Sequence, residues 1–364
     1  FSKLADYFGE IEKTTLRNEK TVILTEILKE ASTEEVAPLV YLALGGLRPA
    51  FDRLEFNMAE AMILRSIAAS VSKNLHEIEI EYQKIGDLGE LVEKFSNHKP
   101  ALPRGRFSNS QMSVVDVYVE LEKIALANGA GSQDRKVMGL AKLIKEVESQ
   151  SAKFIVRMVS GKLRLGFSDK TVIDALSFLE NGTKEYSDML DRAYQRRPDV
   201  GVLALVVKEK GVEAAVNSID ATIGTPIVPA LAQRLKTPVE MIEKMGMVYC
   251  ESKFDGTRVQ IHFSRSKLQS SDRSLTQGSE LGEQASMFEE EKPRFFVRTF
   301  TRNLDESSAM FPELQHIAAQ IKADEVILDS EAVGYDPKTG KQVPFQMTIT
   351  RKRKHGVTEA QNDV

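Results

Sequence analysis

The sequence predicts a multidomain protein, with an all-α first part over residues 1–215 and an α/β second part with a mixed sheet over residues 216–364. Three observations lead to this fold class. Apolar residues recur every three or four positions through the first part, which is the spacing of amphipathic helices. Pro226 and Pro229 then interrupt the pattern, because proline fits neither a helix interior nor a central strand. Beyond them the apolar period shortens to two, which is typical of strands with one buried face.

The composition is that of a globular protein. Hydrophobic residues make up 42% and charged residues 28%, a balance that excludes disordered and membrane classes. The single cysteine, Cys250, excludes an intrachain disulfide and fits a reducing compartment. One cysteine and five histidines argue against a structural zinc site. The net charge of −4 means that any nucleic-acid binding has to come from local basic patches.

The start of the chain bears on its location. Residues 1–20 predict one amphipathic helix and lack the basic start and apolar core of a signal peptide. No apolar run approaches the roughly 20 residues that span a bilayer. We therefore expect a cytoplasmic protein with no membrane partner. The chain begins with Phe1 rather than Met, so we expect a fragment or a processed product.

Helix signals are clearest in residues 32–46. Ser32 is placed to cap a helix, with Glu35 three residues later in capping-box spacing, and Gly45-Gly46 ends it. Residues 113–129 and 136–161 also predict helices, with weaker caps. Residues 97–111 are rich in Pro, Gly, Ser and Asn, which predicts an exposed loop.

In the second part, Val259, Ile261 and Phe263 alternate with polar residues and predict a half-buried strand. Residues 294–302 and 325–336 predict two further strands, with a helix between them that starts near Pro312. The polar stretch 264–293 predicts a flexible loop between two strands.

The motif Lys253-x-Asp255-Gly256-x-Arg258 precedes the first of these strands. By average residue usage, chance matches in a chain of this length number roughly 0.01. A surface hairpin is the alternative, since Asp-Gly is a strong turn signal and charges are common beside turns.

Three later segments also carry suggestive charges. Arg302 ends a predicted strand, and Glu331 shares one side of its strand with Ile327 and Val333, where burial would be costly without a cation. Residues 351–354 place four positive charges together. The alternatives are a solvated strand end for Arg302, an ordinary ion pair for Glu331 and an exposed basic loop for residues 351–354.

Residues 160–176 combine charge with glycine. In an extended chain Lys162 and Arg164 lie on one side, and Gly161 and Gly166 allow close approach of a phosphate. Ser168 is placed to cap a helix, whose first amides favour a phosphate. None of these features reads base edges, so the predicted contact is independent of sequence. An ordinary loop before a helix is the alternative.

Taken in order, these segments resemble the ATP-dependent DNA ligases of the archaeal and eukaryotic replicative type, and the resemblance covers most of the chain. It implies a helical DNA-binding domain followed by a nucleotidyltransferase domain. It also implies that the chain stops inside the catalytic domain, with later motifs and an oligonucleotide-binding barrel beyond Val364. We therefore expect the isolated chain to be catalytically impaired.

The resemblance assigns site residues. It implies that Lys253 attacks the α-phosphate of ATP to form a lysyl-AMP, and that Glu251 contacts the adenine amino group from the same strand face. Arg258 and Arg302 would contact ribose or phosphate, and Glu331 the ribose or Mg²⁺. The implied DNA contacts are Gly161, Lys162, Arg164, Gly166, Ser168, Phe345, Arg351, Lys352 and Arg353.

The implied partner is nicked double-stranded DNA of any sequence, bound by a monomer in replication, repair and recombination. A sliding clamp is a further candidate partner, and a prokaryotic protein would be nucleoid-associated. One alternative is an RNA ligase or capping guanylyltransferase, which shares the Lys-x-Asp-Gly core but would not be expected to carry the helical half. Another is a non-catalytic DNA-binding fragment.

Overall fold

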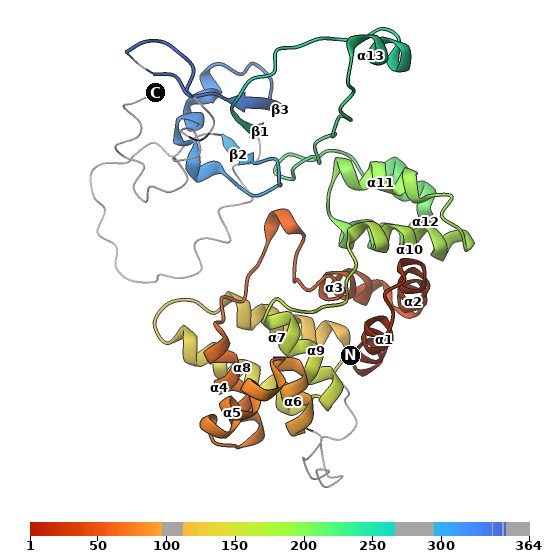
Figure 1. Cartoon of the computed structure of the whole chain (residues 1–364), viewed down its shortest axis with the longest axis vertical. Helices are drawn as coiled ribbons and strands as arrows, with labels where there is room; N and C mark the ends of the chain where they lie inside the picture. Colours follow the sequence, from red (N-terminus) through yellow and green to blue (C-terminus); the bar gives the residue numbers. More distant parts are fainter. Residues whose placement is uncertain (97–111, 266–294, 337, 344–345, 347–364) are drawn as a thin grey trace. The chain divides into compact units, whose positions relative to one another are not determined.

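The computed structural model describes residues 1–96, 112–265, 295–336, 338–343 and 346. The chain divides into two compact units (Figure 1). The helical unit comprises Phe1–Tyr194 and Asp199–Asp220, and the strand unit comprises Gln195–Pro198 and the chain from Ala221 onward.

The helical unit confirms the all-α prediction for the first part of the chain. Its helices are α1 (Ser2–Glu12), α2 (Arg17–Glu30), α3 (Thr33–Ala43), α4 (Glu60–Val71), α5 (Leu75–Ile85), α6 (Leu88–Ser96), α7 (Val114–Leu126), α8 (Ser132–Glu146), α9 (Ser149–Val159), α10 (Asp169–Asn181), α11 (Ser187–Arg196) and α12 (Val200–Ser218), with a short 3-10 turn, η1 (Ala50–Asp52).

Local signals explain some helix ends. Ser32 and Glu35 form the predicted capping box of α3. Ser113 and Asp116 form a second box at α7, so the prediction of a weaker cap there was wrong. The single helix predicted for residues 1–20 is two helices, because residues 13–16 break between α1 and α2. Residues 136–161 are likewise divided between α8 and α9.

Helix α6 packs closely on α9, with Gly89 at the point of contact. A side chain at Gly89 would lie 2.8 Å from the carbonyl oxygen of Lys153 and from the Arg157 side chain. Because glycine has no such side chain, α6 can lie directly against α9. Elsewhere α2 packs on α10, α3 on α12 and α4 on α8, and their buried apolar residues form one continuous core.

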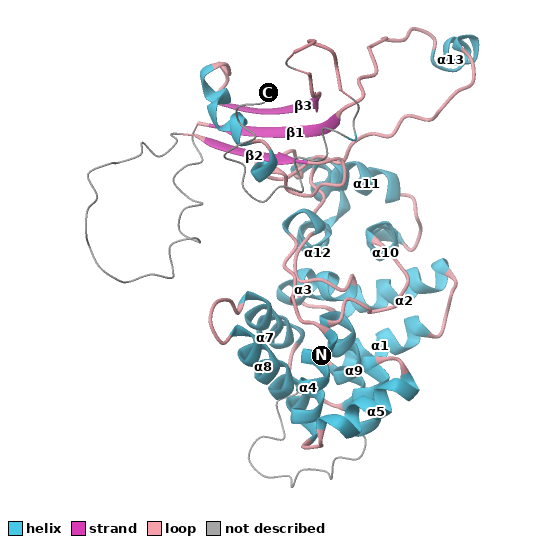
Figure 2. Cartoon of the chain, turned by 60° about the vertical axis from the view of Figure 1, so that its left-hand side comes forward, coloured by secondary structure: helices cyan, strands magenta, loops and turns pink. Residues whose placement is uncertain are grey.

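The strand unit contains a three-stranded sheet (Figure 2). Its strands are β1 (Thr257–Ser264), β2 (Phe296–Phe300) and β3 (Glu325–Ala332), in the order β2-β1-β3. Both pairings are antiparallel, so the predicted mixed sheet is not what the described residues form. The predicted helix near Pro312 is a 3-10 helix, η4 (Pro312–Ala319), which follows η3 (Ser308–Met310).

Strand β1 is buried on both faces, contrary to the half-buried strand that its alternation predicted. Gln260 is 3% exposed and His262 is fully buried. The Gln260 carboxamide accepts from the Ile227 backbone N–H (2.7 Å) and donates to the Ile227 carbonyl (3.3 Å). His262 Nδ1 accepts from the backbone N–H of Gly224 (3.1 Å). The polar face therefore pairs with the backbone of the segment that enters this unit.

The apolar core of the strand unit is small. Among the described residues, Val259, Ile261 and Phe311 form one buried cluster with partly buried neighbours from β2, β3, η3 and η4, and Phe263 and Phe300 are also fully buried. Helix α13 (Pro238–Met245) has no buried residue. Several large apolar side chains before β1 are exposed, among them Ile242, Met245, Met247 and Tyr249. No helix in the described part of the chain is long and apolar enough to cross a membrane.

Candidate functional site

The predicted nucleophile lies in an irregular segment. Residues 248–255 form no regular structure, and both Lys253 and Glu251 are exposed. Strand β1 begins only at Thr257, so the prediction that these two residues share a strand face was wrong. Neither side chain makes a hydrogen bond or an ion pair with another residue that the structure describes.

Gly256 brings the motif against the end of β3. A side chain at this position would overlap the carbonyl oxygen of Ala332 and lie 2.9 Å from Cγ of Glu331. The Gln342 side chain also donates to the Asp255 carbonyl (3.4 Å). A close backbone approach therefore requires the glycine of Lys-x-Asp-Gly and places the predicted ribose- and metal-binding carboxylate beside it.

Arg258 lies directly opposite Glu331 in the pairing of β1 with β3. Its Nε forms an ion pair with Asp329 Oδ1 (2.8 Å), and its side chain is 14% exposed. Its Nη1 is buried without a hydrogen-bond partner among the described residues. Since a buried unpaired donor is costly, this guanidinium is suited to a further acceptor such as a phosphate or ribose oxygen.

The other two predicted ligands of the nucleotide are exposed. Glu331 is exposed on β3, so the cost of burying its carboxylate does not arise. Arg302 follows the end of β2 and is exposed as well. No three His, Cys, Asp or Glu side chains in the described ranges come together as a metal-binding group.

In the helical unit, the segment from Gly161 to Ser168 has the predicted pattern of exposure. Lys162 and Arg164 are exposed, while Leu163 and Leu165 are buried. The chain is not simply extended, however, because Arg164 has a left-handed backbone with φ of +61°. The flanking glycines, Gly161 and Gly166, also have positive φ values, +69° and +66°.

Ser168 is the N-cap residue of α10, as predicted, but its side chain accepts no hydrogen bond from the helix. Surface hollows of about 380 and 580 Å³ both include Phe167 and Ser168 in their walls. The smaller hollow is also lined by Arg17 and Lys20. The larger hollow is lined by Arg48 and Arg53, so both hollows at the start of α10 have two basic residues in their walls.

Lys20 supports the segment from α2. It is 8% exposed, and its Nζ donates to the carbonyl oxygens of Leu165 (2.5 Å) and Gly166 (3.3 Å). These bonds fix the backbone just before α10.

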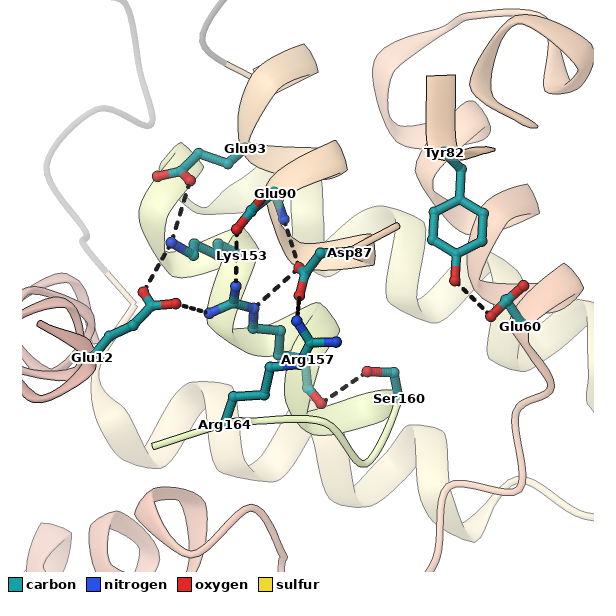
Figure 3. Close-up of polar contacts among 10 residues, drawn as sticks. All are labelled: Glu12, Glu60, Tyr82, Asp87, Glu90, Glu93, Lys153, Arg157, Ser160 and Arg164. Carbon is teal, nitrogen blue, oxygen red and sulfur yellow. Dashed lines mark hydrogen bonds and ion pairs between the residues drawn. The ribbon is translucent and has the colours of Figure 1, made fainter. Parts of the chain in front are cut away.

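Arg164 is tied to a buried ionic cluster (Figure 3). Its Nη1 lies 2.9 Å from Oδ2 of Asp87, whose side chain is 6% exposed. Oδ1 of the same carboxylate accepts from Arg157 Nε at 3.1 Å. Arg157 is 2% exposed and also pairs with Glu12 Oε1 (2.6 Å) and Glu90 Oε1 (3.5 Å).

The cluster shifts the titration of its acids. Burial alone would raise the pKa of Asp87, but hydrogen bonds from the Glu90 amide and Arg157, together with the charges of Arg157 and Arg164, lower it overall. Burial also opposes ionisation of Glu12, and the hydrogen bonds from Arg157 and Lys153 again leave its pKa below the usual value.

Sequence reasoning missed Lys20, Asp87 and Arg157. A usable signal existed for two of them. Lys20 stands at helical spacing from the buried Leu24, Ile27 and Leu28, and Arg157 interrupts the apolar run of α9. For Asp87 the sequence offered a different signal, a helix start with Glu90 three residues later, which does not point to Arg157. The predicted DNA contacts Phe345, Arg351, Lys352 and Arg353 lie outside the described residues.

A helical unit, followed in the chain by a small antiparallel sheet with Lys-x-Asp-Gly beside β3, is the architecture expected of a helical N-terminal region and a nucleotidyltransferase-type domain. Comparison with known families identifies it further. Residues 1–177 match the DNA ligase N terminus family, and residues 229–364 match the ATP dependent DNA ligase domain. The chain belongs to the ATP-dependent DNA ligase family.

Curated relatives agree. A probable DNA ligase of Dictyoglomus turgidum is 36% identical over 360 residues, 99% of this chain and 55% of that protein. DNA ligase 2 of Thermofilum pendens is 33% identical, covering 100% of this chain and 56% of that protein. A DNA ligase of Staphylothermus marinus is 34% identical, in a match that covers 100% of this chain and 58% of that protein. The chain therefore spans somewhat more than half the length of these relatives.

Proposed function

We propose that this chain provides the DNA grip and the AMP-accepting lysine of an enzyme that seals nicks in duplex DNA. In the first step the Lys253 amine attacks the α-phosphorus of ATP. A phosphorus–nitrogen bond forms, the bond to the bridging oxygen breaks, pyrophosphate leaves and the amine proton passes to solvent. A 5′-phosphate oxygen at the nick then displaces the lysine, and the 3′-hydroxyl displaces AMP.

The contact of Gly256 with the end of β3 is the observation that best supports this proposal. It brings the turn of the motif beside Glu331, while Arg258 keeps one buried Nη1 without a partner in the described structure. We propose that Arg258 and Arg302 receive phosphate or ribose oxygens, that Glu331 receives the ribose hydroxyls, and that Glu251 accepts from the adenine amino group. Holding these groups in register would supply much of the rate.

Glu331 also fits the proposed use of Mg²⁺. This ion is usually held by one or two carboxylates together with substrate phosphates, so a cluster of three protein ligands is not required. Glu331 offers one exposed carboxylate beside the motif, whereas Asp329 is already paired with Arg258. When bound, the ion would offset phosphate charge and stabilise the leaving pyrophosphate.

We propose that the segment from Gly161 to Ser168 grips the phosphate backbone of the nicked duplex. Lys162 and Arg164 are exposed, and Ser168, the residue before α10, lies in the walls of both hollows. Phosphate contacts carry no sequence information, which suits an enzyme that acts on nicks of any sequence in replication, repair and recombination. Recruitment by a sliding clamp and action as a monomer remain parts of the proposal.

The proposal is tested with ATP labelled at the α-phosphate. After long incubation with Mg²⁺, we expect label on the wild-type chain and none on Lys253→Ala. Lys322→Ala is the matched control, because Lys322 is another exposed lysine of the strand unit. Label persisting on Lys253→Ala would exclude this lysine as the nucleophile.

The same assay separates the alternatives. A chain that binds nicked DNA but never takes up label would be a DNA-binding fragment without catalysis. Preference for GTP, or transfer of the nucleotide to RNA rather than to nicked DNA, would indicate a capping enzyme or an RNA ligase.

A further inference from the structure

The Asp87 carboxylate is fixed in place by its own unit. It precedes α6, is 6% exposed and has both oxygens engaged. Oδ1 accepts from the Glu90 backbone N–H (2.9 Å) and from Arg157 Nε (3.1 Å), which leaves Oδ2 for Arg164. Since Arg157 is itself buried and bound to Glu12, the carboxylate has little freedom to turn.

Arg164 is held by that carboxylate at one nitrogen only. Its side chain is 54% exposed, and Asp87 occupies Nη1. In Figure 3 the other terminal nitrogen points away from Asp87. A guanidinium has five N–H donors in a rigid fork, so Arg164 can bind Asp87 and a phosphate at the same time.

The backbone at Arg164 is also constrained. Its φ of +61° is uncommon for a residue with a side chain. Such a conformation persists only where the surroundings determine it. Two contacts support it: the ion pair of the Arg164 side chain with Asp87, and the hydrogen bonds that Lys20 donates to the carbonyls of Leu165 and Gly166.

We propose that Asp87 is a positioning residue for DNA binding, which holds the Arg164 guanidinium with its remaining N–H groups ready for a backbone phosphate. This inference rests on the proposed DNA contact of the segment from Gly161 to Ser168. It predicts that removing Asp87 weakens DNA binding, whereas charge alone would predict tighter binding. An acid beside a DNA-binding arginine lowers the local positive charge, so its removal would strengthen binding if charge alone mattered.

The test measures the affinity of the 364-residue chain for two unrelated nicked duplexes at several salt concentrations. We expect Asp87→Asn to weaken binding to both by about tenfold, the size of one hydrogen bond to a charged group. The log–log salt slope should flatten by up to roughly 0.9, one phosphate contact. In an Arg164→Ala background, Asp87→Asn should have no further effect.

Glu90→Gln is the matched control. It removes the same charge from the same cluster, 3.5 Å from Arg157, and Glu90 makes no ion pair with Arg164 among the described contacts. We expect its affinity to equal or exceed that of the wild type. Binding tightened by Asp87→Asn, or weakened equally by both substitutions, would overturn the positioning role.

Arg164→Lys provides a second arm that does not depend on the folding of Asp87→Asn. A lysine keeps the charge but lacks the fork that serves two anions, so we expect a loss close to that of Arg164→Ala. Affinity restored by Arg164→Lys would overturn the proposal, whereas an equal loss supports it.

The same measurements distinguish an error in the proposed DNA contact from an error in the positioning role of Asp87. If Arg164→Ala leaves both affinity and salt slope unchanged, the proposed DNA contact at this residue is wrong. If Arg164→Ala weakens binding but Asp87→Asn does not, only the positioning role is wrong.

Discussion

The two units hold their candidate residues in different ways. In the helical unit, Arg164 is bound to Asp87, which is bound to the buried Arg157. In the strand unit, Lys253 and Glu251 are exposed and have no hydrogen bond or ion pair to other described residues. The helical unit therefore holds Arg164 through a neighbouring side chain, whereas the strand unit holds Lys253 through no such contact among the described residues.

The difference follows from the size of the two cores. The helices share one continuous core, and at its edge Arg157 and Asp87 are both buried. Among the described residues of the strand unit, three form a buried apolar cluster and Phe263 and Phe300 are buried as well, while most of β3 is exposed. Rigid positioning of a side chain needs packed neighbours and hydrogen-bonded partners. We infer that Arg164 is held in place before DNA binds, as Arg258 is held by Asp329, whereas Lys253 and Glu251 gain their geometry from contacts with the nucleotide.

The largest expected effect tests the buried cluster. Arg157→Ala leaves Asp87 and Glu12 without their main cation, so it should lower the free energy of unfolding of the helical unit by about 3–5 kcal/mol. The measurement is urea unfolding followed by far-UV circular dichroism. Lys142→Ala is the control, because its pair with Glu146 is exposed and worth about 0–1 kcal/mol. A loss below about 1 kcal/mol for Arg157→Ala would show that the cluster does not support its unit.

The next effect concerns the strand unit. Gly256→Ala would place a methyl group against the Ala332 carbonyl, which costs about 1–3 kcal/mol of local strain. We expect uptake of AMP to slow by about tenfold or more, while unfolding of the helical unit is unchanged. Gly46→Ala is the control, since its nearest contact would be an ordinary 3.6 Å. Unchanged uptake would show that the approach of Gly256 to β3 does not shape the site.

A smaller effect should appear with pH. The pKa values of Asp87 and Glu12 are lowered in the folded helical unit. A lowered carboxyl pKa contributes stability above the unfolded value, near 4, and this stability is lost as pH falls through the folded value. We expect the unfolding free energy of the helical unit to fall below about pH 4, and to fall less in Asp87→Asn. An identical pH profile in the variant would contradict the assignment to Asp87.

The smallest effect on stability is expected at Lys253. Because the side chain is exposed and lacks described contacts, Lys253→Ala should change the free energy of unfolding by no more than about 0.5 kcal/mol. The same variant should lose the AMP adduct completely. A clear loss of stability would show that the lysine is held by the fold and would weaken the contrast between the units.

Much of the local structure could be predicted from short-range patterns. The capping box of Ser32 and Glu35, the buried Leu163 and Leu165 between exposed basic residues, and the positions of the three strands depend on residues close together in the chain. Backbone dihedral angles and the choice of buried face respond directly to such neighbours. The same patterns could not show the left-handed Arg164, whose supports come from Asp87 and Lys20 far along the chain. The break between α1 and α2 has a local contact instead, since the Thr14 hydroxyl accepts from the Leu16 backbone N–H (3.1 Å).

The sequence by itself determined the all-helical first half, the strands of the second half and the motifs that resemble a DNA ligase. Only the tertiary structure decided that Asp87 meets Arg157 across 70 residues of chain, that Lys20 reaches the carbonyl of Leu165 across 145, and that the polar face of β1 is covered. The physical reason is that such contacts depend on which helix faces and strand faces pack together. Periodicity identifies a face to be buried, but it does not identify the partner that buries it.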